Sequence, residues 1–114
     1  MVVDTRTEAD VDRIFHALAD TTRRDIFRRV LHNGHSVSTL ARQYDMSFAA
    51  IQKHVSVLER ATLVVKEKHG REQIVHGNVP TLRTALSLLD GFEEIWIHRA
   101  SRIADILGQE GSAA

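Results

Sequence analysis

The segment from Met46 to Leu58 constrains the fold more than any other part of this sequence. Ser47 can cap the start of a helix, because its hydroxyl accepts a hydrogen bond from a first-turn amide. The residues that recur at helical spacing and form one packed face are Ala50, Ile51, His54, Val55 and Leu58. The opposite face carries Phe48, Gln52, Lys53 and Ser56, with no carboxylate before Glu59. Such a face suits a helix that enters a groove of nucleic acid.

A second, shorter helical pattern precedes this segment, from Val37 to Tyr44. Asp45 and Met46 join the two as a tight turn. Helix, turn and helix in this order predict a helix-turn-helix whose second helix, expected from Phe48 to Ala61, reads the nucleic acid. We call this second helix the reader helix.

The charges are distributed unevenly, although the net charge of the chain is zero. Residues 21–76 hold ten Lys and Arg against five Asp and Glu, a net charge of +5. Residues 1–20 carry −3 and residues 77–114 carry −2. A basic centre between acidic ends is expected when one face meets phosphate.

Length and composition fit one small domain of 114 residues. The absence of cysteine excludes disulfides and thiolate metal sites and fits a reducing compartment. No apolar run approaches the roughly 18 residues of a membrane span, and the first residues lack the layout of a signal peptide. We therefore expect a soluble cytoplasmic protein with no membrane partner.

Two short helices are expected before the helix-turn-helix, after a flexible N-terminus at residues 1–8. The first has an apolar face from Val11 to Leu18, and the second runs from Arg23 to Leu31. The second helix exposes a basic face, for which solvation and phosphate contact both stay open: Arg23, Arg24, Arg28 and Arg29. Asn33 and Gly34 end it, with the glycine able to take a positive φ.

After the reader helix, two β-rich runs between Leu63 and His76 flank a glycine-containing tip, which predicts a hairpin. Lys66, Lys68, His69 and Arg71 surround the tip. A basic hairpin directly after a reader helix is the wing of a winged helix, with an ordinary solvent-facing hairpin as the alternative. The fold class is therefore mainly α with a small β-hairpin, a winged helix-turn-helix domain over residues 9–107.

The last helix is expected over residues 81–107, followed by a flexible tail at 108–114. One apolar stripe runs along it: Leu82, Leu86, Leu89, Trp96, Ala100 and Ile103. Flanking apolar residues widen this stripe beyond what a small domain can cover with its own core. The sequence therefore predicts a homodimer built mainly on this helix.

With these residues in hand, the chain resembles the ArsR/SmtB family of bacterial winged-helix repressors over nearly its whole length. The motifs that carry the resemblance run from Ala17 to Arg24 and from Met46 to Glu59, with Leu63-Val64 and Gly70-Arg71 after them. The end of the chain, from Trp96 to Ile103, is similar to autorepressor-like members without a known metal requirement.

The resemblance implies a symmetric dimer on double-stranded DNA, with two reader helices in successive major grooves of a near-palindromic operator. Ser47, Phe48, Gln52, Lys53 and Ser56 fall on the DNA-facing surface of the family. Gln52 stands where the family commonly has a smaller serine, and its amide can form two hydrogen bonds with adenine. Lys53 is expected to contact phosphate. Lys68 and Arg71 are the wing contacts; Arg24, Arg42 and Ser47 are weaker phosphate candidates. His54 is expected at the core edge or on phosphate.

Thr62 stands where the family usually has glycine at the end of the reader helix. A β-branched residue would be strained at positive φ, so we expect a rearranged helix end.

No metal site or cofactor is expected, because the cysteine ligands of the metal-sensing members are absent here. On the last helix, Asp90, Glu94 and His98 share a face and could ligate a metal. However, Phe92 replaces the histidine of the family's metal-binding pair, and a solvated polar face is the favoured interpretation.

The leading hypothesis is a dimeric DNA-binding transcriptional regulator that acts as a repressor. A metal-responsive repressor and a winged-helix interaction module without an operator stay as alternatives. We expect no enzyme, because no phosphate loop, acid–base pair or nucleophile motif occurs. The operator, the regulated genes and any effector are left open.

Overall fold

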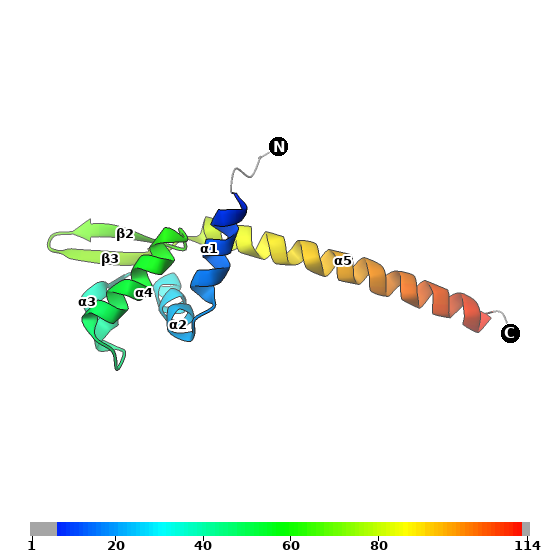
Figure 1. The fold of residues 1–114 in the computed structure, drawn as a ribbon, viewed down its shortest axis with the longest axis horizontal. Coiled ribbons are helices and arrows are strands. Elements are labelled where there is room, and N and C mark those ends of the chain that lie inside the picture. The colour runs from blue at the N-terminus through cyan, green and yellow to red at the C-terminus, as the bar shows by residue number, and fades with distance from the viewer. Residues whose placement is uncertain (1–6, 113–114) are drawn as a thin grey trace. The chain divides into compact units, whose positions relative to one another are not determined.

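The computed structural model describes residues 7–112, and the chain forms two compact units that divide between Arg83 and Thr84. The first unit holds four helices and a three-stranded antiparallel sheet (Figure 1). The helices are α1 (Glu8–Leu18), α2 (Thr21–His32), α3 (Val37–Arg42) and α4 (Phe48–Arg60). The strands are β1 (His35–Ser36), β2 (Val64–His69) and β3 (Glu72–Gly77). The last helix, α5 (Val79–Ser112), begins in the first unit and forms the second.

Each of the helices α1 to α4 starts at a side chain that accepts a first-turn amide hydrogen bond. Thr7 and Asp10 form a reciprocal capping box at α1, in which Thr7 Oγ1 accepts from the Asp10 amide at 3.2 Å. Asp20 caps α2, Ser36 caps α3 and Ser47 caps α4. These caps satisfy amides that have no partner inside the helix, and so fix where each helix begins.

The core of the first unit lies between the helices α1 to α4 and the sheet, with α1 packed on α2 and α4. Nine large apolar side chains are fully buried there: Ile14, Ile26, Leu40, Ile51, Val55, Leu58, Leu63, Val64 and Val75. Helix α4 supplies three of them, and it packs against α1, α2, α3 and β2. The face of α4 that the sequence predicted to be packed is therefore confirmed as the centre of the core.

The hairpin predicted after the reader helix is present, with Val64 opposite Gly77 at its base and His69 opposite Glu72 at its tip. Gly70 lies at the tip with a φ of +62°, where a Cβ would be strained. The sequence did not predict β1, which pairs with β3 through His35–Val75 and Ser36–Ile74. Two residues are too few to produce an alternating pattern that could be recognised.

Gly34 differs from the expectation, because its φ is not positive. The glycine is needed here for a close approach instead. A Cβ at this position would lie 2.4 Å from Cε1 of His76 and 2.8 Å from Cγ2 of Ile74. Helix α2 ends at His32, and Asn33 follows in extended backbone. The chain then passes close to the side chains of β3.

Several helix ends differ from the predicted ones. Helix α1 begins at Glu8, inside the predicted flexible N-terminus, of which residues 1–6 lie outside the described part. Helix α5 spans 34 residues and continues to Ser112, past the predicted end at Leu107 (Figure 1). Residues 108–112 of the predicted flexible tail are helical in the structure. A glycine inside a helix costs only about 1 kcal/mol, so Gly108 alone does not stop the helix.

Thr62 keeps a φ of +59° after α4, so the expected rearrangement of this helix end is wrong. The backbone N–H of Thr62 donates to the Glu59 carbonyl at 2.9 Å. Its Oγ1 donates to the Ala61 carbonyl at 2.7 Å and lies 3.1 Å from Oγ1 of the buried Thr81. Asn78 Nδ2 donates to the Thr62 carbonyl at 2.8 Å. These hydrogen bonds hold a β-branched residue in a left-handed conformation and tie the end of α4 to the start of α5.

We expect Thr62→Gly to be more stable than Thr62→Ala. Both changes remove the hydroxyl, but only alanine keeps a Cβ in the left-handed region, which costs about 1–2 kcal/mol. Urea denaturation of both variants measures this difference. The exposed Ala49, inside α4, is the control, because Ala49→Gly should lower the free energy of unfolding by about 1 kcal/mol. Equal stability of the two Thr62 variants would contradict the strain.

Candidate nucleic-acid interface

Helices α3 and α4 form the helix-turn-helix, and their caps fix the two helix starts. Ser36 Oγ accepts from the Thr39 amide at 3.0 Å at the start of α3. Ser47 Oγ accepts from the Ala50 amide at 3.1 Å at the start of α4. Ile51, Val55 and Leu58 are completely buried, so the opposite face of α4 is turned toward solvent.

The exposed face of α4 carries the side chains that the sequence singled out. Phe48, Gln52 and Ser56 follow one another at intervals of one turn, and Lys53 lies beside Gln52. Phe48, Gln52 and Lys53 are exposed, whereas Ser56 is half-buried. The first acidic residue of α4 is Glu59, in its last turn. This face therefore offers an aromatic ring, an amide and an ammonium group without a competing carboxylate.

A hollow of about 460 Å³ lies between the start of α4 and the tip of the wing. It brings together four of the predicted DNA contacts, Phe48 and Gln52 of α4 with Lys68 and Arg71 of the hairpin. The other lining residues are Ser36, Val37, Ser38, Glu72 and Gln73. The reader helix and the wing thus share one concave surface with apolar, amide and cationic groups and the carboxylate of Glu72.

The remaining predicted contacts lie outside this hollow. Ser47 is exposed, and its oxygen already accepts the capping hydrogen bond. Arg42 is exposed at the end of α3, with Nη2 at 3.4 Å from Thr39 Oγ1. Arg24 lies on α2, where Nη1 donates to the Leu18 carbonyl at 2.8 Å. A phosphate contact by Arg24 would therefore compete with this internal hydrogen bond.

The other three arginines of the basic face of α2 also bond within the chain. Arg23 donates from Nε to the Ala17 carbonyl at 2.8 Å and from Nη2 to the His16 carbonyl at 3.1 Å. Arg28 and Arg29 both pair with Asp25, at 3.3 Å and 2.9 Å. Arg23 therefore ties α2 to the end of α1, whereas the two ion pairs with Asp25 lie within α2, an outcome that the sequence left open.

His54 lies on the inner side of α4, at the edge of the core. Its Nδ1 is 3.3 Å from Arg23 Nη1 and 3.9 Å from Asp20 Oδ1. Asp20 caps α2, and the hydrogen bond from the Arg23 amide is the main cause that lowers the pKa of Asp20. The position of His54 agrees with a core-edge role.

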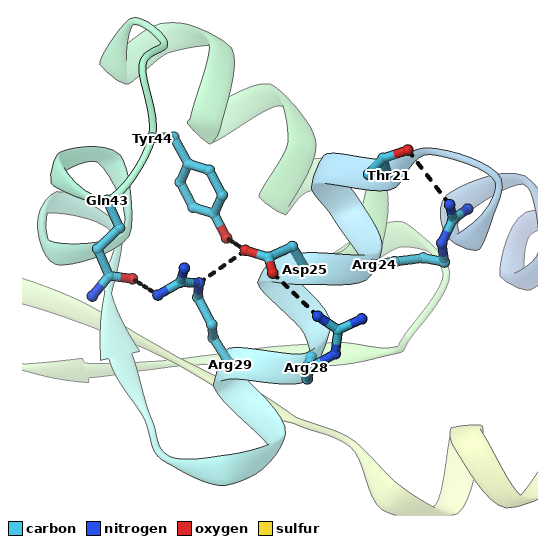
Figure 2. A network of polar contacts seen from close by, with 7 residues as sticks. All are labelled: Thr21, Arg24, Asp25, Arg28, Arg29, Gln43 and Tyr44. Carbon is cyan, nitrogen blue, oxygen red and sulfur yellow. Dashed lines mark hydrogen bonds and ion pairs between the residues drawn. The ribbon is translucent and has the colours of Figure 1, made fainter.

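A polar network centred on Asp25 connects α2 to the turn of the helix-turn-helix (Figure 2). Tyr44 Oη donates to Asp25 Oδ2 at 2.5 Å, and Arg29 Nη1 donates to Gln43 Oε1 at 2.9 Å. The Arg29 guanidinium also lies 5.4 Å from the centre of the Tyr44 ring. Sequence reasoning missed this network, although Asp25 is the only acidic residue between Thr21 and Tyr44.

The network shifts the pKa values of both partners. Burial and the hydrogen bond to Asp25 raise the pKa of Tyr44 to about 12. The hydrogen bonds from Tyr44 and then from Arg29 lower the pKa of Asp25. The hydrogen bond from neutral Tyr44 to ionised Asp25 therefore stabilises the turn before α4.

We expect Tyr44→Phe to lower the free energy of unfolding by about 1–2 kcal/mol, because it removes a hydrogen bond to a charged acceptor. The pKa of Asp25 should rise in this variant. A lowered native pKa contributes stability above the ordinary carboxyl pKa, and this contribution is lost as the pH falls through the native pKa. The stability difference between the wild type and Tyr44→Phe should therefore shrink as the pH falls into the acid range, measured by urea denaturation.

The exposed Arg28 provides the control for this network. Arg28→Gln removes a solvent-exposed ion pair and should change the stability by less than about 1 kcal/mol. A Tyr44→Phe variant as stable as Arg28→Gln at neutral pH would contradict the role of the tyrosine.

The three metal candidates are exposed on α5, at Asp90, Glu94 and His98. Within residues 7–112, no three or more His, Asp or Glu side chains form a group that could hold a metal ion. None of the helices in the same range is long and apolar enough to cross a membrane.

Fold and surface together define a winged helix-turn-helix, and comparison with known proteins identifies its family. Residues 18–67 match a family model described as a helix-turn-helix domain. The chain is 33% identical to the HTH-type transcriptional regulator Rv2034 of Mycobacterium tuberculosis over 100 residues, which cover 88% of this chain and 91% of that protein.

Solved structures of helix-turn-helix regulators also resemble this chain. An ArsR-like transcriptional regulator from Rhodococcus sp. RHA1 is 30% identical, with a TM-score of 0.76 over 87% of this chain and 93% of that one. A winged helix-turn-helix DNA-binding domain from Mycobacterium bovis, described as homodimeric, shares the fold at 19% identity. Its TM-score is 0.62, over 82% of this chain and 92% of that domain. The protein belongs to the ArsR family of helix-turn-helix transcriptional regulators, which are DNA-binding proteins and not enzymes.

Proposed function

We propose that this protein is a sequence-specific repressor that binds a near-palindromic operator as a homodimer, with α4 in the major groove. The observation that carries this proposal is the hollow shared by Phe48 and Gln52 with Lys68 and Arg71. Phe48 and Gln52 can contact base edges, and the two wing cations can hold phosphates. Because all four line one hollow, they can meet the same side of a duplex.

The residues of this surface take different roles. Gln52 reads a base, because its amide can bond N6 and N7 of adenine at the same time. Lys53 holds a phosphate, since its ammonium group is a flexible point charge with little geometric selectivity. Ser47 and Ser56 support the docking of α4, and the wing cations contact the backbone or the minor groove beside it. Arg42 and Arg24 are secondary phosphate contacts.

The dimer is proposed from the surface of α5. Four residues of the predicted stripe are exposed in the single chain, namely Leu86, Leu89, Trp96 and Ile103, while Leu82 and Ala100 are half-buried. Flanking residues add more exposed apolar surface: Leu88, Phe92, Ile95, Ile97, Ile106 and Leu107. An apolar surface of this extent on a long helix marks a contact with another protein chain. The homodimeric state of the Mycobacterium bovis domain with this fold supports a second copy as that chain.

A dimer presents two copies of α4 to one duplex, which is why the operator is expected to be near-palindromic. Occupation of a promoter by such a dimer excludes the polymerase, which gives repression without a cofactor. A regulator of this kind works where the chromosome lies, which places the protein in the cytoplasm.

The roles of Gln52 and Lys53 predict different responses to substitution. Gln52→Ala should weaken the free energy of binding to the preferred duplex by roughly 1–3 kcal/mol and relax the sequence preference at one base pair. Lys53→Ala should weaken binding to all duplexes alike. It should also reduce the slope of log affinity against log salt concentration by about 1. Fluorescence anisotropy on the preferred duplex and on its single-base variants measures both.

Each variant is the control for the other, because the two residues are neighbours on one exposed face of α4. A uniform loss over all sequences on Gln52→Ala would contradict base reading by this residue. Equal, weak binding of preferred and scrambled duplexes by the wild type would instead favour an interaction module without an operator.

The dimer proposal predicts a concentration-dependent signal from Trp96. Trp96 is the only tryptophan and is 63% exposed in the single chain, so its burial in a dimer should shift its emission to the blue. Ile103→Glu should shift the equilibrium toward monomer in sedimentation experiments, since it places a charge in the apolar stripe. Ser101→Glu, an exposed change on the same helix outside the stripe, should leave the dimer intact. Equal dimer strength in both variants would contradict the stripe as the interface.

A further inference from the structure

Phe48 is the first residue of α4, and the residue is 47% exposed. Its position therefore has a cost, because apolar surface left in water is unfavourable by roughly 25 cal/mol per Å². In a reader helix, the N-terminal residues are those that come nearest to base edges. An exposed aromatic ring at this point is therefore in place for an apolar group of the ligand.

The surroundings of the ring show what kind of ligand that is. Gln52 lies one turn further along α4 on the same face, and both side chains line the hollow with Lys68 and Arg71. The two cations favour a polyanion over an apolar protein surface. Glu72 lies on the same lining, at the wing side of the hollow on β3, and not on the reader helix.

We propose that Phe48 is a specificity-determining residue that contacts the 5-methyl group of a thymine in the major groove. Thymine alone among the four bases presents an apolar group there, and phenylalanine is one of the side chains that contact it. The thymine lies in the same half-site as the adenine that Gln52 reads, in that base pair or the next. The preferred half-site is therefore predicted to contain an A·T pair whose methyl group contributes to affinity. This inference rests on the proposed function.

The test removes the methyl group and nothing else. Duplexes are first selected from a random library with the full-length protein, so the operator sequence need not be known in advance. Each thymine of one half-site in the selected duplex is then replaced in turn by deoxyuridine, which keeps every hydrogen-bonding group. Affinities are measured by fluorescence anisotropy at one fixed, near-physiological salt concentration.

We expect one replacement per half-site to weaken binding of the wild type by about 4-fold, as for the loss of one buried methyl-sized group. Phe48→Ala should bind the selected duplex more weakly and show no further loss on the same replacement. Phe48→Leu, which keeps an apolar side chain, should retain part of the methyl dependence.

Met46 offers a matched control, since it is 40% exposed in the turn before α4 but does not line the hollow. Met46→Ala should keep the full loss on deoxyuridine replacement. Circular dichroism of all variants verifies that these exposed changes leave the fold intact.

Three results separate this inference from the proposed function. Specific binding of the selected duplex with no sensitivity to any deoxyuridine would overturn the role of Phe48 and leave the regulator function standing. The same methyl dependence in Phe48→Ala as in the wild type would assign the methyl contact to another residue, which also overturns the inference. Failure of the library to yield any preferred sequence would overturn both.

Discussion

Burial of one face of α4 is the constraint on which the rest of the structure depends. Ile51, Val55 and Leu58 are fully enclosed by α1, α2, α3 and the sheet, so rotation of α4 about its axis would place apolar groups in water. Loss of one such side chain costs about 2–5 kcal/mol in other proteins, which makes the orientation of α4 energetically unambiguous. The exposed face of the helix is fixed as a consequence. Phe48, Gln52 and Lys53 face solvent because the apolar side chains on the opposite face of α4 are buried.

Polar contacts at the two ends of α4 complete this orientation. Before the helix, Asp25 connects α2 to Tyr44 in the turn (Figure 2). After it, Thr62 keeps the left-handed conformation that ends the helix, and its carbonyl accepts a hydrogen bond from Asn78. Both ends therefore hold the reader helix at a set position relative to α2 and the wing. The hollow shared by the reader helix and the wing follows from this arrangement.

Much of this architecture could be predicted from the sequence, because helical periodicity and serine caps are local signals. The core face of α4 and the order of the helices follow from them, and the hairpin follows from two β-rich runs around a glycine-containing tip. Strand β1 could not be predicted, since two residues such as His35 and Ser36 carry no periodicity. The partners of Arg23 and the hydrogen bond from Arg29 to Gln43 could not be predicted either, because these groups come within reach only when the helices pack. The ion pairs of Arg28 and Arg29 with Asp25 lie within α2, at a spacing that the sequence does show. At Thr62, the steric preference of a β-branched residue predicted a rearranged helix end. The hydrogen bonds to Ala61 and from Asn78 outweigh this preference, and Thr62 keeps its positive φ.

The most direct test of the account is the ratio of affinities for a selected duplex and a scrambled duplex of equal length and composition. Fluorescence anisotropy of the full-length protein at one near-physiological salt concentration gives both values. A reader helix that contacts base edges predicts a ratio of roughly a thousand or more. A ratio near one would mean that only phosphate contacts contribute, and would contradict the assignment of α4 as a reader of sequence.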